Sequence, residues 1–130
     1  MRLGPHAWDL RRRIIGEDAR FCGRAEIVAS DHGWVYQETG SLKLRGGQPF
    51  AAGRQYRLEE RPEGVRISFD DHRLFQMVRW ADPRAVHICP PDRYEGVYDV
   101  TRWPSWRAQC TVTGPRKSYR IVSIYTPTAS

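Results

Sequence analysis

The 130-residue chain has an ordinary hydrophobic content, which excludes a disordered protein, and it lacks an apolar run of the roughly 18 residues that a membrane-spanning helix needs. Its length predicts a single domain over residues 1–130, large enough to bury a hydrophobic core. The net charge of +6 comes mainly from arginines spread along the chain, whereas nucleic-acid-binding proteins more often carry a concentrated basic stripe, so we predict neither a nucleic-acid nor a membrane partner.

The cysteines and the first residues indicate where the protein works. Cys22, Cys89 and Cys110 are odd in number and widely spaced, which argues against a disulfide framework. The first residues lack the apolar stretch of a secretory signal. We therefore expect a cytoplasmic protein. The chain has no Cys-x-x-Cys or His-x-x-x-His pair that would suggest a metal site.

Two long strands are predicted at the start of the chain. In the first, which ends at Ile15, the alternate residues Trp8, Leu10 and Arg12 share one face, as in a half-buried strand. The second covers Ala19–Ser30, and the small residues on its apolar face indicate a crowded or strongly curved sheet.

The next two strands, Trp34–Leu44 and Phe50–Glu60, form a predicted hairpin. If both apolar faces point the same way, residue i lies opposite residue 92 − i, which places Glu38 across from Arg54. A two-residue loop would put these faces on opposite sides of the sheet, so we expect a longer or bulged connection.

Four shorter strands follow, separated by turn signals. They cover Val65–Phe69, Leu74–Trp80, Val86–Cys89 and Arg93–Thr101. The alternation is weaker in the second of these strands. The fourth carries Tyr94, Gly96 and Tyr98 on one face.

The last hairpin, from Trp106 to Tyr125, has the clearest pattern. Two runs rich in β-branched and aromatic residues flank a Gly-Pro turn. The turn pairs Trp106 with Tyr125 and Val112 with Tyr119, and the period of two then holds on both strands in one register.

Together these segments predict an all-β fold, a single up-and-down antiparallel β-barrel of about 8–10 strands. Successive hairpins without a long crossover favour a meander, and closing it into a barrel removes the exposed edges of an open sheet. A sandwich is the alternative architecture, and a short helix near the start of the chain is left open.

Two groups of residues resemble known families. The opening Leu3/Gly4…Trp8 resembles the first-strand signature of the calycin superfamily, which includes lipocalins and fatty-acid-binding proteins. A second group is similar to an uncharacterised family of small, mainly bacterial cytoplasmic proteins: His87-x-Cys89, Asp92-x-Tyr94-x-Gly96-x-Tyr98, Trp106 and Gly114-Pro-x-Lys117-x-Tyr119. The resemblance implies a calycin-like barrel without an established activity. It also implies that Trp8 packs beneath an arginine, for which Arg12 and Arg120 are the candidates.

His87 and Cys89 are candidates for catalytic chemistry, because a Cys–His pair can supply a nucleophile and a base. Side chains two apart on a strand lie about 7 Å apart, however, which is too far for direct proton transfer. Haem ligation through His87 is a further alternative, since some distantly similar barrels bind haem through one histidine. The simplest interpretation is a hydrogen-bonded core histidine and a buried thiol, without a cofactor.

Ten polar and aromatic residues belong to strand faces that turn inward in a closed barrel. They are Tyr36, Glu38, Arg54, Tyr56, His87, Tyr94, Tyr98, Trp106, Tyr119 and Tyr125. Their hydroxyls and charges must be satisfied by each other, by water or by a ligand. We therefore predict a cavity that binds an amphipathic or anionic small molecule, with Arg54 contacting the anion and Glu38 within salt-bridge reach. The predicted apolar walls are Phe21, Ile27, Leu42, Phe50 and Val112.

Two other functions are compatible with the same barrel. The first is an enzyme, an isomerase or lyase that uses His87 or a tyrosine as general acid–base. The second is an interaction module with a solid core, whose arginine-rich outside binds an acidic partner. No catalytic residue or metal ligand is assigned, and the oligomeric state is left open.

Overall fold

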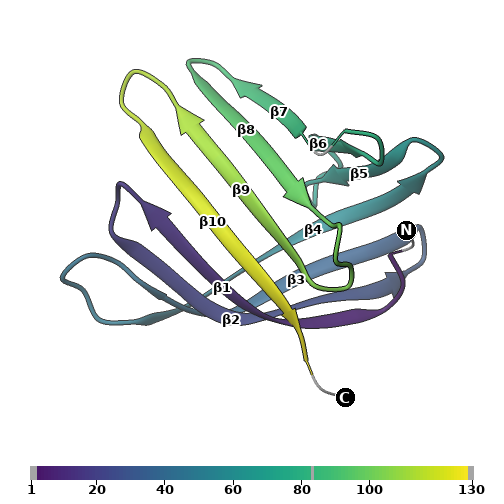
Figure 1. Cartoon of the computed structure of the whole chain (residues 1–130), viewed down its shortest axis with the longest axis horizontal. Coiled ribbons are helices and arrows are strands. Elements are labelled where there is room, and N and C mark those ends of the chain that lie inside the picture. The colour runs from purple at the N-terminus through teal and green to yellow at the C-terminus, as the bar shows by residue number, and fades with distance from the viewer. Residues whose placement is uncertain (1–2, 83, 129–130) are drawn as a thin grey trace.

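The computed structural model describes residues 3–82 and 84–128, and within them ten strands and no helices are found (Figure 1). The strands are β1 (His6–Ile15), β2 (Ala19–Ser30), β3 (Gly33–Lys43), β4 (Phe50–Arg61), β5 (Gly64–Ser68), β6 (Leu74–Arg79), β7 (Arg84–Cys89), β8 (Asp92–Asp99), β9 (Trp106–Thr113) and β10 (Ser118–Pro127). The all-β prediction is confirmed, and the strands lie within a few residues of their predicted positions.

All ten strands belong to one antiparallel sheet, in the order β6-β5-β4-β3-β2-β1-β10-β9-β8-β7. Every strand pairs with its sequence neighbours except at β6 and β7, and β1 pairs with β10, so the sheet is an up-and-down meander that curls into a nearly closed barrel. The two edge strands, β6 and β7, approach each other in Figure 1, but the described residues form no strand pairing between them. We call this junction the seam.

The two long hairpins have the predicted registers. In the β9–β10 hairpin, Trp106 lies opposite Tyr125. In the β3–β4 hairpin, Glu38 lies opposite Arg54, and the connection is residues 44–49, long enough to keep both apolar faces on the inside. The expected longer connection is thereby confirmed.

The hydrophobic core is built around Trp8, which is 0% exposed. Its ring meets those of Trp103, Trp106 and Tyr125 edge-on, at centroid distances of 5.6, 5.8 and 6.1 Å. The indole N–H, which needs a partner when it is buried, donates to the carbonyl oxygen of Pro104 at 2.6 Å. This aromatic group fills one part of the barrel and leaves the rest open to a cavity.

The expectation that Trp8 packs beneath an arginine is wrong. Within the described residues, the guanidinium of Arg12 lies over the ring of Phe21, at 5.6 Å from its centroid, and it binds Glu38. Arg120 is exposed on β10. A guanidinium that can form charge-assisted hydrogen bonds to a buried carboxylate gains more than it would over an indole ring, which explains the position of Arg12.

The predicted crowding on the inward face of β2 is confirmed at one glycine pair. Gly23 lies directly opposite Gly40 of β3. A Cβ atom at Gly40 would lie 2.6 Å from Gly23 Cα and 2.8 Å from Phe21 Cζ. The pair therefore lets the Phe21 ring lie close against the sheet.

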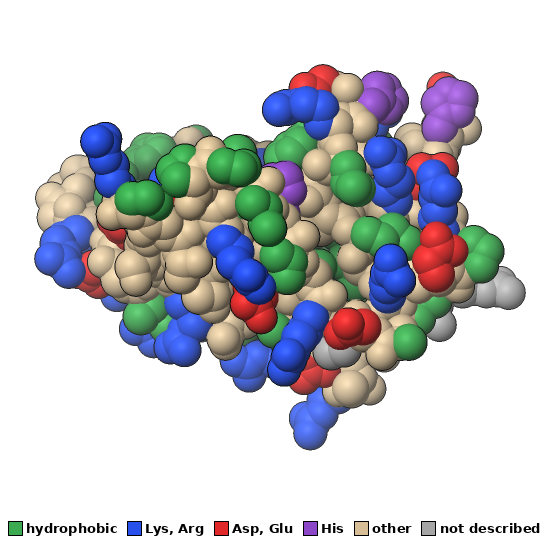
Figure 2. Space-filling model, turned by 90° about the horizontal axis from the view of Figure 1, so that it is seen from above, with side chains coloured by type: hydrophobic (Ala, Val, Ile, Leu, Met, Phe, Trp, Pro, Cys, Tyr) green, Lys and Arg blue, Asp and Glu red, His purple; other side chains and the backbone are tan. Residues whose placement is uncertain are grey.

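Charged side chains are concentrated on the outside of the barrel. On the face shown in Figure 2, Lys and Arg side chains are interspersed with Asp and Glu. Exposed arginines pair with carboxylates two residues away on the same strand, as in Arg24–Glu26 and Arg61–Glu59. Such pairs add little stability in water, but they reduce the local positive charge.

Candidate functional site

A cavity of about 520 Å³ lies inside the barrel, within the range of about 300–1,000 Å³ that is typical of small-molecule sites. All ten residues predicted to face inward line it: Tyr36, Glu38, Arg54, Tyr56, His87, Tyr94, Tyr98, Trp106, Tyr119 and Tyr125. Their inward orientation is confirmed. That they bind a ligand stays a prediction.

A buried ion pair between Arg12 of β1 and Glu38 of β3 forms the polar centre of the cavity wall. Arg12 donates from Nη1 to Oε2 at 2.8 Å and from Nη2 to Oε1 at 2.6 Å, a bidentate pairing. Its Nε donates to Ser123 Oγ of β10 at 2.7 Å. The side chains of the ion pair are only 8% and 2% exposed, so this contact connects three strands inside the barrel.

Arg54 of β4 contacts the same carboxylate. Its Nε donates to Glu38 Oε2 at 2.9 Å, and its Nη2 donates to Oε1 at 3.4 Å, which confirms the predicted salt bridge. Unlike Arg12, Arg54 has a side chain that is 45% exposed, and its Nη1 donates to no acceptor within the described residues. Two guanidinium groups thus share one carboxylate, which leaves one positive charge in excess.

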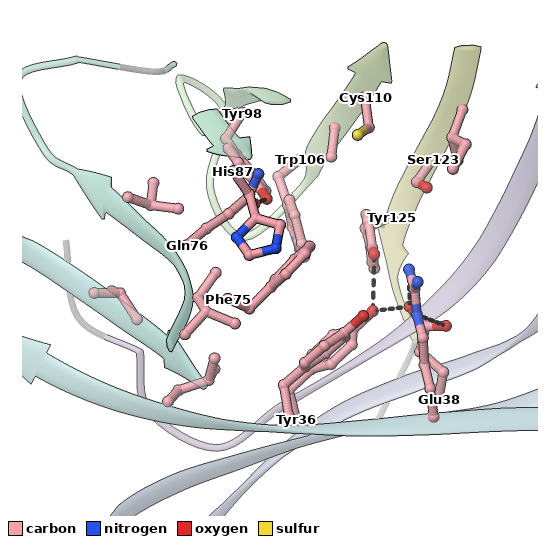
Figure 3. A pocket seen from close by; sticks show the side chains of 18 of the residues that line it. Tyr36, Glu38, Phe75, Gln76, His87, Tyr98, Trp106, Cys110, Ser123 and Tyr125 are labelled. Carbon is pink, nitrogen blue, oxygen red and sulfur yellow. Dashed lines mark hydrogen bonds and ion pairs between the residues drawn. The ribbon is translucent and has the colours of Figure 1, made fainter. Parts of the chain in front are cut away.

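Two tyrosine hydroxyls complete this arrangement (Figure 3). Tyr36 Oη donates to Glu38 Oε1 and lies 2.8 Å from Tyr125 Oη. Arg12 Nη2 reaches the same Tyr125 hydroxyl at 3.3 Å. We call the whole set the ion-pair cluster; its members are Arg12, Tyr36, Glu38, Arg54, Ser123 and Tyr125.

The surroundings of Glu38 fix its charge. Burial alone would raise the pKa of its carboxyl, but the hydrogen bond from Arg12 and the charge of Arg54 lower that pKa to about 2. Burial raises the pKa of Tyr36 and Tyr125 above the usual tyrosine value. At neutral pH the carboxylate is therefore ionised, both tyrosines are neutral, and the excess positive charge persists.

A row of aromatic rings leads from the ion-pair cluster to the seam. Tyr36 stacks with Tyr56 at 6.2 Å between centroids, and Tyr56 stacks with Phe75 of β6 at 5.3 Å. Across the seam, Phe75 contacts His87 of β7 at 5.4 Å, and His87 contacts Tyr94 at 5.9 Å. We call these five side chains the aromatic row, and its contacts bridge the seam where strand pairing is missing.

His87 and Cys89 differ from the expected core histidine and buried thiol. Cys89, the last residue of β7, is exposed. His87 is half-buried, and within the described residues its ring nitrogens make no hydrogen bond; its contacts are the rings of Phe75 and Tyr94. The structure shows no proton-transfer contact between His87 and Cys89.

A second polar pair lies on the other side of the cavity from the ion-pair cluster (Figure 3). Tyr98 of β8 donates a hydrogen bond to Oε1 of Gln76 of β6, which is only 2% exposed. Next to it, Phe75 has no partner in the β5–β6 register, which shifts at this point. This bulge lets the consecutive residues Phe75 and Gln76 both line the cavity.

The predicted apolar walls are wrong in part. Ile27 lines the cavity, whereas Phe21 and Val112 are buried outside its lining, Leu42 packs against the core, and Phe50 is 47% exposed. Residues from the later strands and their connections supply most of the apolar lining. They include Leu58, Val65, Ile67, Phe69, Phe75 and Val78.

Three polar residues of the cavity were not predicted from the sequence: Arg12, Gln76 and Ser123. The inward position of Arg12 could have been predicted from the sequence, because Arg12 shares a strand face with Trp8 and Leu10. Among the described residues, no group of three or more His, Cys, Asp and Glu side chains is arranged to hold a metal ion. None of them forms a helix with the length and apolar character required to cross a membrane.

Comparison with family models gives a match over residues 5–127 to a family of unknown function, DUF6314. The chain belongs to the DUF6314 family. The match includes all ten strands of this DUF6314 protein, and with them the ion-pair cluster and the aromatic row. Comparisons with curated proteins and with solved structures give no match.

Proposed function

We propose that this DUF6314 protein is a calycin-like, cytoplasmic β-barrel that binds an amphipathic small molecule with an anionic group. The observation that carries the proposal is the position of Arg54: its half-exposed side chain lines the cavity beside an ion pair that is already complete. The free thiols of Cys22, Cys89 and Cys110 support a reducing compartment.

Arg54 is available to a ligand because Arg12 alone satisfies Glu38. The two Nη atoms of Arg12 already contact both carboxylate oxygens. A ligand carboxylate that binds Nη1 and Nη2 of Arg54 would neutralise the excess positive charge, and the planar guanidinium suits such a two-point contact. A ligand with one negative charge matches this end of the cavity.

The rest of the lining suits an apolar ligand body. Aliphatic and aromatic side chains from β4 to β6 face the same cavity as Arg54. One further donor is present, since Trp106 Nε1 is buried and lacks an acceptor among the described residues. Apolar walls with a few fixed polar groups are the usual composition of a small-molecule site.

The two alternative functions have less support. A cavity of about 520 Å³ argues against the solid core of an interaction module. For an acid–base enzyme, burial raises the pKa of Tyr36, Tyr98 and Tyr125, so that none of them is an efficient base at neutral pH. His87 is therefore the residue to test by substrate turnover.

The proposal is tested by calorimetric titration with decanoate and with its uncharged counterpart decanol. We expect decanoate to bind the wild type, and Arg54→Ala to lose at least about tenfold in affinity, since hydrogen bonds to charged groups contribute about 1.5–3 kcal/mol. Arg57→Ala is the matched control, because Arg57 lies on the same strand with its guanidinium hydrogen-bonded to the backbone of Asp70 at an exposed site.

Equal affinity of wild type and Arg54→Ala for decanoate would show that the anion site is wrong. Loss of the β-sheet circular dichroism signal in Arg54→Ala would instead make the Arg54–Glu38 pair structural. Native mass spectrometry of the protein from its source cells complements the titration, because a copurifying small molecule would identify the ligand directly.

A further inference from the structure

We infer that Gln76 is a second recognition point in the cavity and that it binds a hydrogen-bond acceptor at the far end of the ligand. The ligand class is then a flat, ring-containing monoanion with a carbonyl-type oxygen opposite its anionic group. This inference rests on the proposed anion site at Arg54. Three observations support it: the side-chain N–H of Gln76 has no acceptor among the described residues, the bulge turns this side chain inward, and the aromatic row lies between Arg54 and Gln76.

The side-chain amide of Gln76 has an unused donor. Its Oε1 accepts the hydrogen bond from Tyr98, and within the described residues its Nε2 has no acceptor. The residue is only 2% exposed, yet it lines the cavity. An amide N–H that lines the cavity and has no acceptor in the protein can donate a hydrogen bond to a ligand oxygen.

The local backbone is arranged to place this amide in the cavity. The bulge at Phe75 turns two consecutive side chains inward, although a regular strand would point one of them outward. On β8, a Cβ atom at Gly96 would lie 3.3 Å from Gln76 Nε2 and 3.1 Å from Tyr98 Cε2. The glycine therefore leaves room for the amide beside its partner.

The aromatic row connects the two recognition points. Arg54 Cζ lies 5.4 Å from the centroid of the Tyr56 ring, and this ring lies 5.3 Å from that of Phe75, the residue next to Gln76. A body of one or two rings between the anionic group and the acceptor matches this path. Flat rings can also stack against the faces and edges of the row.

The test uses two pairs of carboxylate probes, one built on benzoate and one on naphthoate. Each pair has an acetyl group opposite the carboxylate in one member and an isopropenyl group in the other, so that a CH₂ group replaces the carbonyl oxygen. For at least one ring system, we expect the wild type to bind the acetyl probe about tenfold more tightly. Gln76→Leu should remove this preference, whereas Gln55→Leu, at an exposed site on β4, should retain it.

Gln76→Met is the second variant if Gln76→Leu fails to fold. Methionine has nearly the length of glutamine, is uncharged and has no N–H to donate, so the preference for the acetyl probe should again be lost. Equal binding of acetyl and isopropenyl probes by the wild type in both ring systems would overturn the inference and leave the anion site standing. Failure of all four carboxylates to bind while decanoate binds would overturn the ring-containing ligand class, and failure of decanoate as well would overturn the proposed function itself.

Discussion

Arg12 and Arg13 are neighbours on β1 with opposite surroundings. Arg12 is buried and bound to Glu38 and Ser123, whereas Arg13 is exposed. Removing one partner of a buried ion pair typically costs about 3–5 kcal/mol, and an exposed substitution usually stays within about 0.5 kcal/mol. We therefore expect Arg12→Ala to lower the free energy of unfolding in urea by about 3–5 kcal/mol and Arg13→Ala to leave it nearly unchanged. Similar losses in both variants would contradict a structural role for the ion pair.

Glu38 makes stability depend on acid pH. Its pKa is lowered from 4.5 to about 2 in the folded protein, so ionised Glu38 stabilises the fold above pH 4.5, and this contribution is lost as the pH falls from 4.5 through 2. The contribution is about 3 kcal/mol at neutral pH. Carbon NMR of the carboxyl group should show Glu38 titrating near pH 2. A midpoint near 4.5 would mean that the cluster does not stabilise the ionised form.

At the residue scale, the alternation of inward and outward side chains along each strand was enough to predict most of the polar residues that line the cavity. It placed Glu38 and Arg54 opposite each other on adjacent strands, with both side chains inside the barrel, and the structure shows them in contact. It also placed Arg12 beside Trp8 and Leu10. The alternation of residues along a strand could not predict the partner of Arg12. Glu38 is two strands away, and the distance between the two side chains depends on the curvature of the barrel.

The strands of the sheet differ in how their backbones are held. β1 is paired on both sides, with β2 and β10, whereas β6 and β7 each have one paired side. Amides in segments with fewer strand pairings and fewer local contacts need less free energy to open, so their hydrogens exchange with solvent faster. We expect hydrogen exchange, followed by mass spectrometry, to be fastest in strand peptides from β6 and β7 and slowest in those from β1 and β10. Uniform protection across all ten strands would show that side-chain contacts hold the seam as firmly as strand pairing.

At the element scale, the sequence predicted regular hairpins well and irregular strands poorly. The β9–β10 register follows from one turn and strict alternation. In Leu74–Arg79 the alternation is weak because the bulge at Phe75 changes which residues face inward. Gln76 was therefore missed, since a period of two cannot place residues beyond an unrecognised bulge.

At the scale of the whole molecule, the sequence indicated a closed meander but not how it closes. Strand pairing joins β1 to β10, while side chains such as Phe75 and His87 bridge the seam. Contacts between side chains distant in sequence have no local pattern. The cavity volume likewise depends on how the ten strands curl together, which no single segment determines.

Because β1 pairs with β10, the order of the strands along the chain can be changed by circular permutation. Trp8 lies opposite Pro127, and the Thr128 amide donates to the Ala7 carbonyl at 3.1 Å, so the two terminal strands are neighbours. A circular permutant that joins the ends of the chain by a short linker and opens it between β6 and β7 would run along the sheet from one edge to the other without losing a strand pair. We expect it to fold with the same circular dichroism spectrum, whereas a permutant opened inside the β9–β10 turn should be less stable.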